Sequence, residues 1–299
     1  MSTSNMAVEV FREIENEDFR TLSIIEAAMA KHEFVPTEQI YKFAKVPPDR
    51  INFSLAKLHK LGLIYRNKGG YVGYTLNYAG YDSLAINALV KSDVLASFGQ
   101  PLGVGKEADV YDALNPSGKR LAVKFHRLGR ISFRQTRRKR GYIKEHSSWL
   151  YQSHLAAERE FNAMKLAYEK GVAVPEPICQ NRHVIAMGMI DGAQLIKYKD
   201  IGKAEKVLEE ILLNVKKAYV EAHIIHADLS EYNIILKPEG DILMIDWPQA
   251  VKKDHTNATE LLERDLRNIL TFFRRKFKIK LAIKEAYEYV INEAESLPI

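Results

Sequence analysis

Apolar side chains recur every three or four positions through the first part of the chain, which is the spacing of amphipathic helices. One such stretch runs from about 8 to 31, with a break indicated near Asn16. A second begins at Thr37, whose hydroxyl is expected to cap it, and a third begins at Pro48, a residue type favoured at the first helical position. Gly62 follows as a stop signal. The pattern therefore predicts three helices ahead of this glycine.

The pattern then changes to β-prone residues in two short runs within 63–76. The pair Gly69-Gly70 between them predicts the turn of a hairpin. A further helical stretch covers about 82–90. Three helices followed by a hairpin is the order of elements in a winged-helix module, so we expect residues 1–91 to form such a domain.

From residue 92 onward, short β-prone runs alternate with longer helical stretches. Strands are predicted at 96–104, 109–114, 120–125 and 184–190, and helices at 153–170, 205–221, 258–277 and 280–295. This order predicts a second, larger domain over 92–299 and places the whole chain in the α+β class.

Composition narrows the cellular setting. The 299 residues suffice for two domains with separate cores. Cys179 is the only cysteine, so no disulfide can form within the chain, and a reducing, cytoplasmic setting is expected. No apolar run approaches the ~20 residues of a membrane-spanning helix, and residues 1–18 are too polar and acidic for a secretory signal. No membrane contact is therefore expected, and the sequence leaves the oligomeric state open.

The positive charge of the chain is concentrated in one segment. The net charge is +6, yet the segment 127–147 alone carries eight Lys or Arg residues and one acid. A basic charge confined to one segment favours a local contact with a polyanion. Residues 1–91 carry eleven bases and ten acids, which is weakly basic for a duplex-binding module. The winged helix is therefore expected either to contact nucleic acid or to serve as a scaffold for protein contacts.

Two segments near the end of the chain carry the strongest chemical signal. Asp228, two positions after His226, is followed by Asn233 five positions later and by Asp246 eighteen positions later, and apolar runs that predict strands flank them. One carboxylate can align a nucleophile, while a carboxamide and a second carboxylate can supply oxygen ligands to Mg²⁺. We therefore expect the three side chains to meet at one end of a small sheet and to form a phosphoryl-transfer site.

A candidate nucleotide-binding loop lies earlier in the same domain. Gly103-Val104-Gly105 joins two predicted strands, where glycines let backbone N–H groups approach phosphate oxygens. Lys124 follows in the middle of an apolar strand, where its charge needs an acidic partner. The next helix offers Glu158 and Glu160. Glu160 is preferred because Met164, one turn later, is expected to face inward with it, and Glu158 is the alternative.

Taken in order, the glycine loop, strand lysine, helix glutamate, His-x-Asp loop and strand-end aspartate resemble those of the RIO atypical serine protein kinases. The closest resemblance is to the two-domain, archaeal-type subfamily with an N-terminal winged helix. The matching motifs span almost the whole chain and lie at 103–108, 123–125, 160–161, 226–233 and 245–249, with a further similar stretch at 260–265. The resemblance implies a minimal bilobal kinase fold, with an N-lobe over about 92–186, a hinge at about 187–191 and a C-lobe over about 192–299.

The resemblance also implies a role for each matching residue. Asp228 is the catalytic carboxylate, and Asn233 and Asp246 hold Mg²⁺, or Mn²⁺ in its place. Lys124, oriented by Glu160, contacts the α- and β-phosphates of ATP. The remaining ATP-binding residues cover the triphosphate or meet adenine at the hinge, and they are Gly103, Val104, Gly105, Lys106, Glu107, Ala108, Met189 and Ile190.

The chain departs from the ordinary protein-kinase pattern in ways that affect its activity. Ala108 replaces a third glycine, and Trp247-Pro248 stands where Phe-Gly usually follows the metal-binding aspartate. No Ala-Pro-Glu motif follows Asp246, so a peptide-docking subdomain is expected to be missing. In the family this goes with slow autophosphorylation and with ATP hydrolysis through an aspartyl phosphate, here on Asp246. The candidate autophosphorylation sites are Ser132, Ser147 and Ser148.

The family acts in maturation of the small ribosomal subunit. The resemblance therefore implies a pre-ribosomal particle and its rRNA as partners, contacted by the basic segment 127–147 as a flexible loop and by the winged helix. Two alternatives stay open on sequence alone. One is a small-molecule kinase of the aminoglycoside or choline type, which also uses His-x-Asp and Ile-Asp-Trp motifs, and the other is an inactive kinase fold that serves as a nucleic-acid-binding regulator.

Overall fold

The computed structural model describes residues 3–67, 69–129 and 142–298, without the side chains of residues 3–5 and 142–148. The candidate phosphorylation sites Ser132, Ser147 and Ser148, with most of the basic segment, lie outside these described side chains. The chain forms two compact units, one made of Met1–Ala157 with Cys179–Ala186 and the other of Glu158–Ile178 with Met187–Ile299. The chain therefore crosses from one unit to the other three times.

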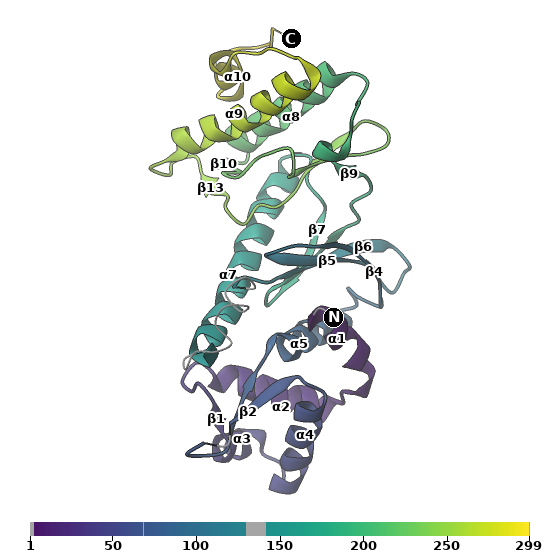
Figure 1. Ribbon diagram of the computed structural model, residues 1–299, viewed down its shortest axis with the longest axis vertical. Helices are drawn as coiled ribbons and strands as arrows, with labels where there is room; N and C mark the ends of the chain where they lie inside the picture. Colours follow the sequence, from purple (N-terminus) through teal and green to yellow (C-terminus); the bar gives the residue numbers. More distant parts are fainter. Residues whose placement is uncertain (1–2, 68, 130–141, 299) are drawn as a thin grey trace. The chain divides into compact units, whose positions relative to one another are not determined.

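The first part of the first unit is a winged helix (Figure 1). Its helices are α1 (Thr3–Val10), the short 3-10 helix η1 (Phe11–Glu13), α2 (Asn16–Ala28), α3 (Thr37–Ala44), α4 (Pro48–Lys60) and α5 (Tyr78–Lys91). Its strands are β1 (Val35–Pro36), β2 (Ile64–Asn67) and β3 (Gly73–Leu76), which form an antiparallel sheet in the order β1-β3-β2. The predicted succession of three helices and a hairpin is confirmed.

Two local predictions in this domain are wrong. The Thr37 hydroxyl, expected to cap α3, donates instead to the backbone carbonyl of Val72 at 3.1 Å, because the strand of the wing lies beside the start of the helix. Helix α5 begins at Tyr78 rather than near residue 82. The side chain of Asn77 caps it by accepting the N–H of Gly80 at 3.0 Å, which satisfies a backbone donor at the helix start.

A five-stranded sheet follows in the order β4-β5-β6-β8-β7. Its strands are β4 (Ser97–Val104), β5 (Ala108–Leu114), β6 (Arg120–His126), β7 (Pro177–Asn181) and β8 (Val184–Gly188). The predicted strands at 96–104, 109–114 and 120–125 are confirmed, and β7 is a strand that the pattern did not show. Because β6 lies in the middle of the sheet, its side chains are enclosed by neighbours on both sides.

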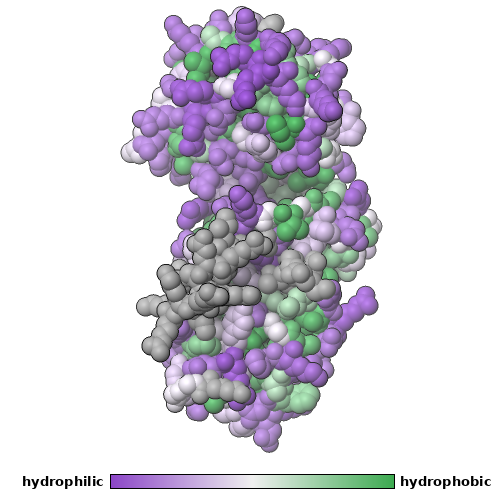
Figure 2. All heavy atoms as spheres, in the orientation of Figure 1, coloured by the Kyte–Doolittle hydropathy of each residue, from purple (hydrophilic) through white to green (hydrophobic). Residues whose placement is uncertain are grey.

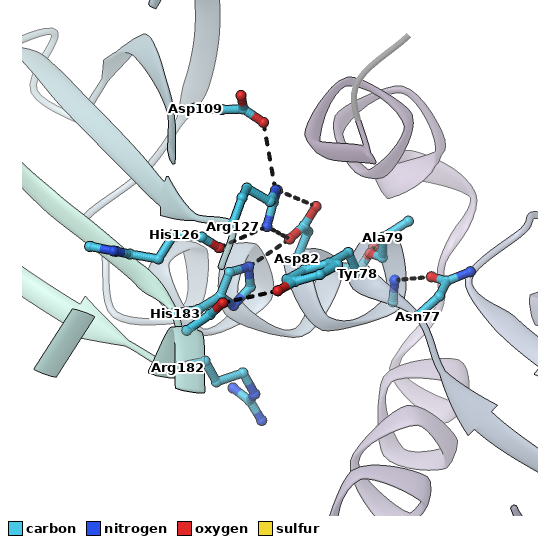
Figure 3. Close-up of polar contacts among 12 residues, drawn as sticks. Asn77, Tyr78, Ala79, Asp82, Asp109, His126, Arg127, Arg182 and His183 are labelled. Atoms are coloured by element: carbon cyan, nitrogen blue, oxygen red, sulfur yellow. Dashed lines mark hydrogen bonds and ion pairs between the residues drawn. The ribbon is translucent and has the colours of Figure 1, made fainter. Parts of the chain in front are cut away.

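A buried charged cluster joins α5 of the winged helix to β5 and β6 of this sheet (Figure 3). Arg127 is only 2% exposed and donates from both terminal guanidinium nitrogens to the carboxylate of Asp82, at 2.8 and 2.7 Å. Its Nε lies 3.6 Å from the Asp109 carboxylate, and its guanidinium lies over the Tyr78 ring. Nε2 of the fully buried His183 lies 2.7 Å from the same Asp82 carboxylate. These side chains hold the winged helix and the sheet together through one hydrogen-bonded ion cluster.

The stability of the protein is expected to fall as the pH is lowered from about 6.5 toward 4. Burial lowers the pKa of His183 from 6.5 to about 4, although the hydrogen bond with Asp82 acts in the opposite direction. In this window the unfolded chain takes up a proton at His183 that the folded chain excludes, so protonation favours unfolding by up to about 3 kcal/mol. Urea unfolding at a series of pH values checks this. His183→Gln keeps a donor for Asp82 and should flatten the profile, while an unchanged slope in the variant would contradict the assignment.

The second unit contains the C-terminal part of α7 (Tyr142–Glu169) and all of the chain from Met187 onward. Its helices are η2 (Leu195–Lys197), α8 (Ala204–Val220), α9 (Ala258–Phe277) and α10 (Ile283–Val290). Its strands are β9 (Ala193–Gln194), β10 (Ile224–Ile225), β11 (Ile234–Leu236), β12 (Ile242–Met244) and β13 (Val251–Lys252). They form the sheets β12-β11-β9 and β10-β13, and Figure 1 shows α8, α9 and α10 packed side by side. Helix α7 begins earlier than predicted, and α10 is shorter than the predicted 280–295.

Hydrophilic residues cover most of the face shown in Figure 2, and apolar side chains occur there in small groups. None of the helices in the described part of the chain is both long and apolar enough to cross a bilayer.

Candidate active site

The loop between β10 and β11 is built around a buried histidine. The ring of His226 is 3% exposed and packs on Trp247 with 4.5 Å between ring centroids. Its Nε2 lies 3.0 Å from the backbone carbonyl of Ile245, so the neutral ring donates there. Burial lowers the pKa of His226, which favours this uncharged form. The histidine thus joins the loop that carries Asp228 to the segment that carries Asp246.

The structure brings the three predicted catalytic and metal-binding residues to one end of a hairpin. Strands β11 and β12 pair antiparallel, and just beyond the last pair the Ile245 N–H donates to the Asn233 carbonyl at 2.9 Å. Asp246 is the next residue along the chain. The Asn233 side chain donates from Nδ2 to the Asp228 carbonyl at 2.8 Å. Asp228 is exposed at this end, whereas Asn233 and Asp246 are half-buried.

The oxygen donors at this end suit a magnesium ion. Because the Asn233 amide nitrogen is occupied by the Asp228 carbonyl, the carboxamide oxygen is the atom left for a cation. Asp246, which follows the residue bonded to the Asn233 carbonyl, supplies a carboxylate. Mg²⁺ usually takes one or two protein oxygens and completes its shell with water and substrate phosphates. In the described residues no group of three or more His, Cys, Asp or Glu side chains could hold a metal ion. One carboxylate and one carboxamide thus fit a magnesium ion that completes its shell with water and nucleotide phosphates.

Two residues of this site have an unusual backbone conformation. Ala227 has φ 62° and Asp246 has φ 71°, both in the left-handed region that residues with a Cβ rarely adopt. Such a conformation costs about 1–3 kcal/mol and persists where surrounding contacts impose it. Here the loop hydrogen bonds around His226 and Asn233 impose it. The two segments that carry Asp228 and Asp246 therefore each hold one residue in a costly backbone conformation, as do six other non-glycine residues of the described chain.

Asp265 of helix α9 anchors the backbone of the loop that carries Asp228. It is 1% exposed, and its two carboxylate oxygens accept the N–H groups of Ala227 at 2.7 Å and Leu229 at 2.9 Å. Arg264 donates to the Ala227 carbonyl, and Asn268 donates to the Leu229 carbonyl at 3.1 Å. Three residues within about one and a half turns of α9 therefore fix the backbone on both sides of Asp228.

The sequence pattern assigned no role to Asp265, although it lies in the stretch 260–265 that resembles the family. The signal that could have found it is an acid at an inward-facing position of an amphipathic helix, where a buried charge needs several donors. Burial raises the pKa of Asp265 to about 7, against the effect of its two N–H donors.

Asp265→Asn is expected to lower kcat by about tenfold while leaving the KM for ATP close to its original value. The amide keeps one acceptor oxygen but places an NH₂ against a backbone N–H, so the loop carrying Asp228 loses one of its two anchors. Steady-state kinetics checks the separation of kcat from KM. Glu260→Gln, on the same helix and exposed, is the matched control. A parallel rise of KM with unchanged kcat would contradict the positioning role.

The glycine loop forms the connection between β4 and β5. The Gly105 N–H donates to the Ala108 carbonyl at 2.8 Å, closing a tight turn around Lys106 and Glu107. A side chain at Gly103 would meet no heavy atom within 4 Å, so the loop is open on that side. Gly103, Val104, Gly105, Lys106 and Glu107 are exposed, and Ala108 is half-buried. The Glu107 carbonyl accepts the Arg127 N–H at 2.6 Å, which ties the loop to the cluster in Figure 3.

The remaining predicted nucleotide-binding residues are distributed over both units. Lys124 is 8% exposed on the central strand β6 of the first unit. In the second unit Glu160 is 1% exposed on α7, whereas Glu158 is exposed. Because a buried carboxylate needs a cationic partner more than an exposed one does, this difference favours Glu160 over Glu158 as the partner of Lys124. Met189 and Ile190 lie directly after β8 and are half-buried.

Comparisons with known proteins match both parts of the chain. A family model described as the RIO domain matches residues 109–286, and a model described as Rio2, N-terminal, matches residues 11–92. The chain is 42% identical over 274 residues to the RIO-type serine/threonine-protein kinase Rio2 of Methanocaldococcus jannaschii, an alignment that covers 88% of this chain and 99% of that protein. It is 38% identical over 271 residues to the serine/threonine-protein kinase rio2 of Dictyostelium discoideum, covering 90% of this chain and 52% of that protein.

A solved structure is similar over nearly the full length. The crystal structure of the Rio2 kinase-ADP/Mg²⁺-phosphoaspartate complex from Chaetomium thermophilum superposes with a TM-score of 0.84 at 33% identity, covering 97% of this chain and 90% of that one.

Proposed function

We propose that this chain, which belongs to the Rio2 group of the RIO serine/threonine-protein kinase family, uses Mg²⁺ and ATP both to phosphorylate serine and to hydrolyse ATP through an aspartyl phosphate. The family, the fold class and the kinase activity predicted from the sequence are confirmed by the relatives and the solved structure. The observation that carries the proposal is the convergence of Asp228, Asn233 and Asp246 at one end of the β11–β12 hairpin.

Each of these residues has a distinct task in the proposed reaction. The exposed carboxylate of Asp228 aligns the attacking hydroxyl or water and accepts its proton. The oxygens of Asn233 and Asp246 hold Mg²⁺, which when bound neutralises charge on the β- and γ-phosphates. The glycine loop offers backbone N–H groups to the triphosphate, and Lys124 offers its ammonium group. His226 and Asp265 keep the loop in place and touch no substrate.

ATP hydrolysis would proceed in two steps, phosphoryl transfer to Asp246 and hydrolysis of the resulting acyl phosphate. A carboxylate oxygen of Asp246 attacks the γ-phosphorus, the bond to the β-phosphate oxygen breaks, and ADP leaves with its negative charge. Water, deprotonated by Asp228, then attacks the acyl phosphate and releases inorganic phosphate, which restores the carboxylate. The similar Rio2 kinase from Chaetomium thermophilum is described as an ADP/Mg²⁺-phosphoaspartate complex, which supports this route for the present chain.

Acid-quenched labelling with γ-³²P-ATP tests this function. The wild type should retain label that hydroxylamine releases, as an acyl phosphate does, and Asp246→Asn should retain none. Chelation of Mg²⁺ with EDTA should abolish both labelling and turnover. Asp241→Asn, in the exposed turn at the other end of the same hairpin, should label like the wild type. Turnover by Asp246→Asn at the wild-type rate would sink the proposal.

For the cellular role, we propose that the partner is a pre-ribosomal small subunit, which the family resemblance favours. We propose the cytoplasm as the place where the two meet. Apart from Arg127, which is buried, the basic segment carries seven bases and one acid, and this charge alone supports RNA contact. If about seven of these charges engaged single-stranded RNA, log affinity would fall against log salt with a slope near −5. Filter binding of small-subunit rRNA fragments at several salt concentrations measures this slope. The relatives described above are protein kinases, which argues against the metabolite-kinase alternative.

A further inference from the structure

A groove on the winged helix lies between α2 and α3 and is separate from the nucleotide site. Its volume is about 560 Å³, within the range of ligand-binding clefts. It is lined by Arg20, Ser23, Ile24, Ala27, Ala28, Lys31, His32, Gln39 and Phe43. Neither α4, which would read nucleic acid in a winged helix, nor the wing β2–β3 contributes to it.

The floor and one wall of this groove are apolar. Ile24, Ala27 and Ala28 follow one another along one side of α2, and the two alanines let another backbone approach closely. Phe43 on α3 also lines the groove, and 55% of its surface is exposed. The Ser23 hydroxyl donates to the Phe19 carbonyl of its own helix at 2.9 Å, so its proton is not offered to the groove. The groove therefore offers an apolar channel along about two helical turns, or about 12 Å from Arg20 to Ala28.

Positive charge brackets the channel. Arg20 lies near the start of α2, Lys31 in the turn that follows it, and His32 is the next residue. No acid lines the groove. Arg20 and Lys31 form no ion pair within 4.0 Å with any of the described carboxylates. These cations are thus available to a ligand.

The acids of the same helix are occupied elsewhere. Asp18 and Glu15 pair with Lys57 at 2.7 and 3.4 Å. The other two, Glu17 and Glu26, pair with Arg50 at 3.9 Å and with Arg182 at 2.6 Å. Ion pairs thus neutralise the acids away from the groove, and the side of α2 that lines the groove stays positively charged.

We propose that this groove binds the apolar face of an acidic amphipathic helix from a partner protein. A helix laid in a groove is read through apolar side chains at i, i+3 or i+4 and i+7, which matches a channel of about two turns. Acidic residues beyond each end of that apolar face would meet Arg20 and Lys31. Gln39 also lines the groove, and its carboxamide can meet a polar group of the partner. This inference does not depend on the kinase reaction.

Fluorescence anisotropy with the full chain tests the proposal. The probe is a labelled helical peptide of about 14 residues, with leucines at i, i+4 and i+7 and glutamates at both ends. One control peptide has the same composition with scattered leucines, and another has lysines in place of the glutamates. The amphipathic acidic peptide should bind saturably and at least about tenfold more tightly than either control.

Variants of the groove separate its apolar and charged contributions. Phe43→Ala and Ala27→Glu should each weaken binding of the acidic peptide by about tenfold or more. Arg20→Glu combined with Lys31→Glu should reverse the charge preference, so that the lysine peptide binds better than the glutamate peptide. Phe53→Ala is the matched control, because Phe53 is a phenylalanine 72% exposed on α4 outside the groove. Circular dichroism and the unfolding midpoint verify that each variant is folded.

Three outcomes would overturn the proposal. The acidic peptide binds no better than its scattered control, or its binding is unchanged in folded Phe43→Ala and Ala27→Glu, or a single-stranded RNA oligonucleotide binds through Arg20 and Lys31 while the peptide does not. In the last case the positive groove belongs to nucleic acid.

Discussion

Asp228→Asn is expected to lower phosphoryl-transfer turnover by about 10²–10⁴-fold without loss of stability. The carboxylate aligns the nucleophile and takes its proton. An amide oxygen can still accept a hydrogen bond, but it cannot take the proton at neutral pH. Its side chain is exposed, and the hydrogen bond from Asn233 goes to its backbone carbonyl. The Asp265 and Asn268 bonds likewise go to the backbone of the neighbouring residues. The substitution therefore removes the reactive group and keeps the loop.

Release of phosphate from ATP, together with thermal unfolding, checks this prediction. Glu231→Gln, three residues later in the same loop, is the matched control and should keep turnover within about threefold. Binding of Mg-ATP measured by calorimetry should survive in Asp228→Asn. A variant that turns over ATP at the wild-type rate would remove Asp228 from the reaction.

Arg127→Met is expected to destabilise the first unit by about 3–5 kcal/mol. Removal of the guanidinium leaves the carboxylates of Asp82 and Asp109, both fully buried, without their shared cation. Uncompensated buried charge is costly, since the interior screens it poorly. The cost falls on the joint between α5 and the sheet, so the winged helix and the strands should unfold less cooperatively.

Urea unfolding followed by circular dichroism measures this effect. Arg182→Met is the matched control, because Arg182 also makes a two-point pair, with Glu26 at 2.7 and 2.6 Å, but is partly exposed. It should cost only about 1 kcal/mol. A double variant, Arg127→Met with Asp82→Leu, should recover part of the loss, because no lone charge is then left at Asp82. A cost below about 1 kcal/mol for Arg127→Met would mean that the cluster contributes little.

Arg127 also shows how a charge pattern can be misread from sequence. The charge pattern groups it with the basic segment 127–147, as part of a charge that faces a polyanion. The structure places it in the core, between Asp82 on α5 and Asp109 on β5. Its two partners are 45 residues before it and 18 before it, and no local period links them. Charge counts cannot tell a solvated arginine from a buried one.

The hairpin that carries the site was visible in the sequence for a physical reason. Antiparallel pairing of two short apolar runs joined by a turn brings the residues just outside them together, so Asn233 and Asp246 had to meet once β11 and β12 paired. The Asp228 loop was fixed by its short span to Asn233. Asp265, by contrast, reaches the loop from a helix more than thirty residues later, and nothing but the packing of α9 decides that.

The chain's own order of apolar runs, turns and polar residues determined the winged helix, four of the five strands of the larger sheet and the three residues at the hairpin end, because each depends mainly on neighbours close in sequence. Only the tertiary structure decided which charges are buried, which helix holds the catalytic loop and where α2 and α3 leave a groove. Burial and long-range pairing depend on how separate elements pack, and packing is a property of the whole fold.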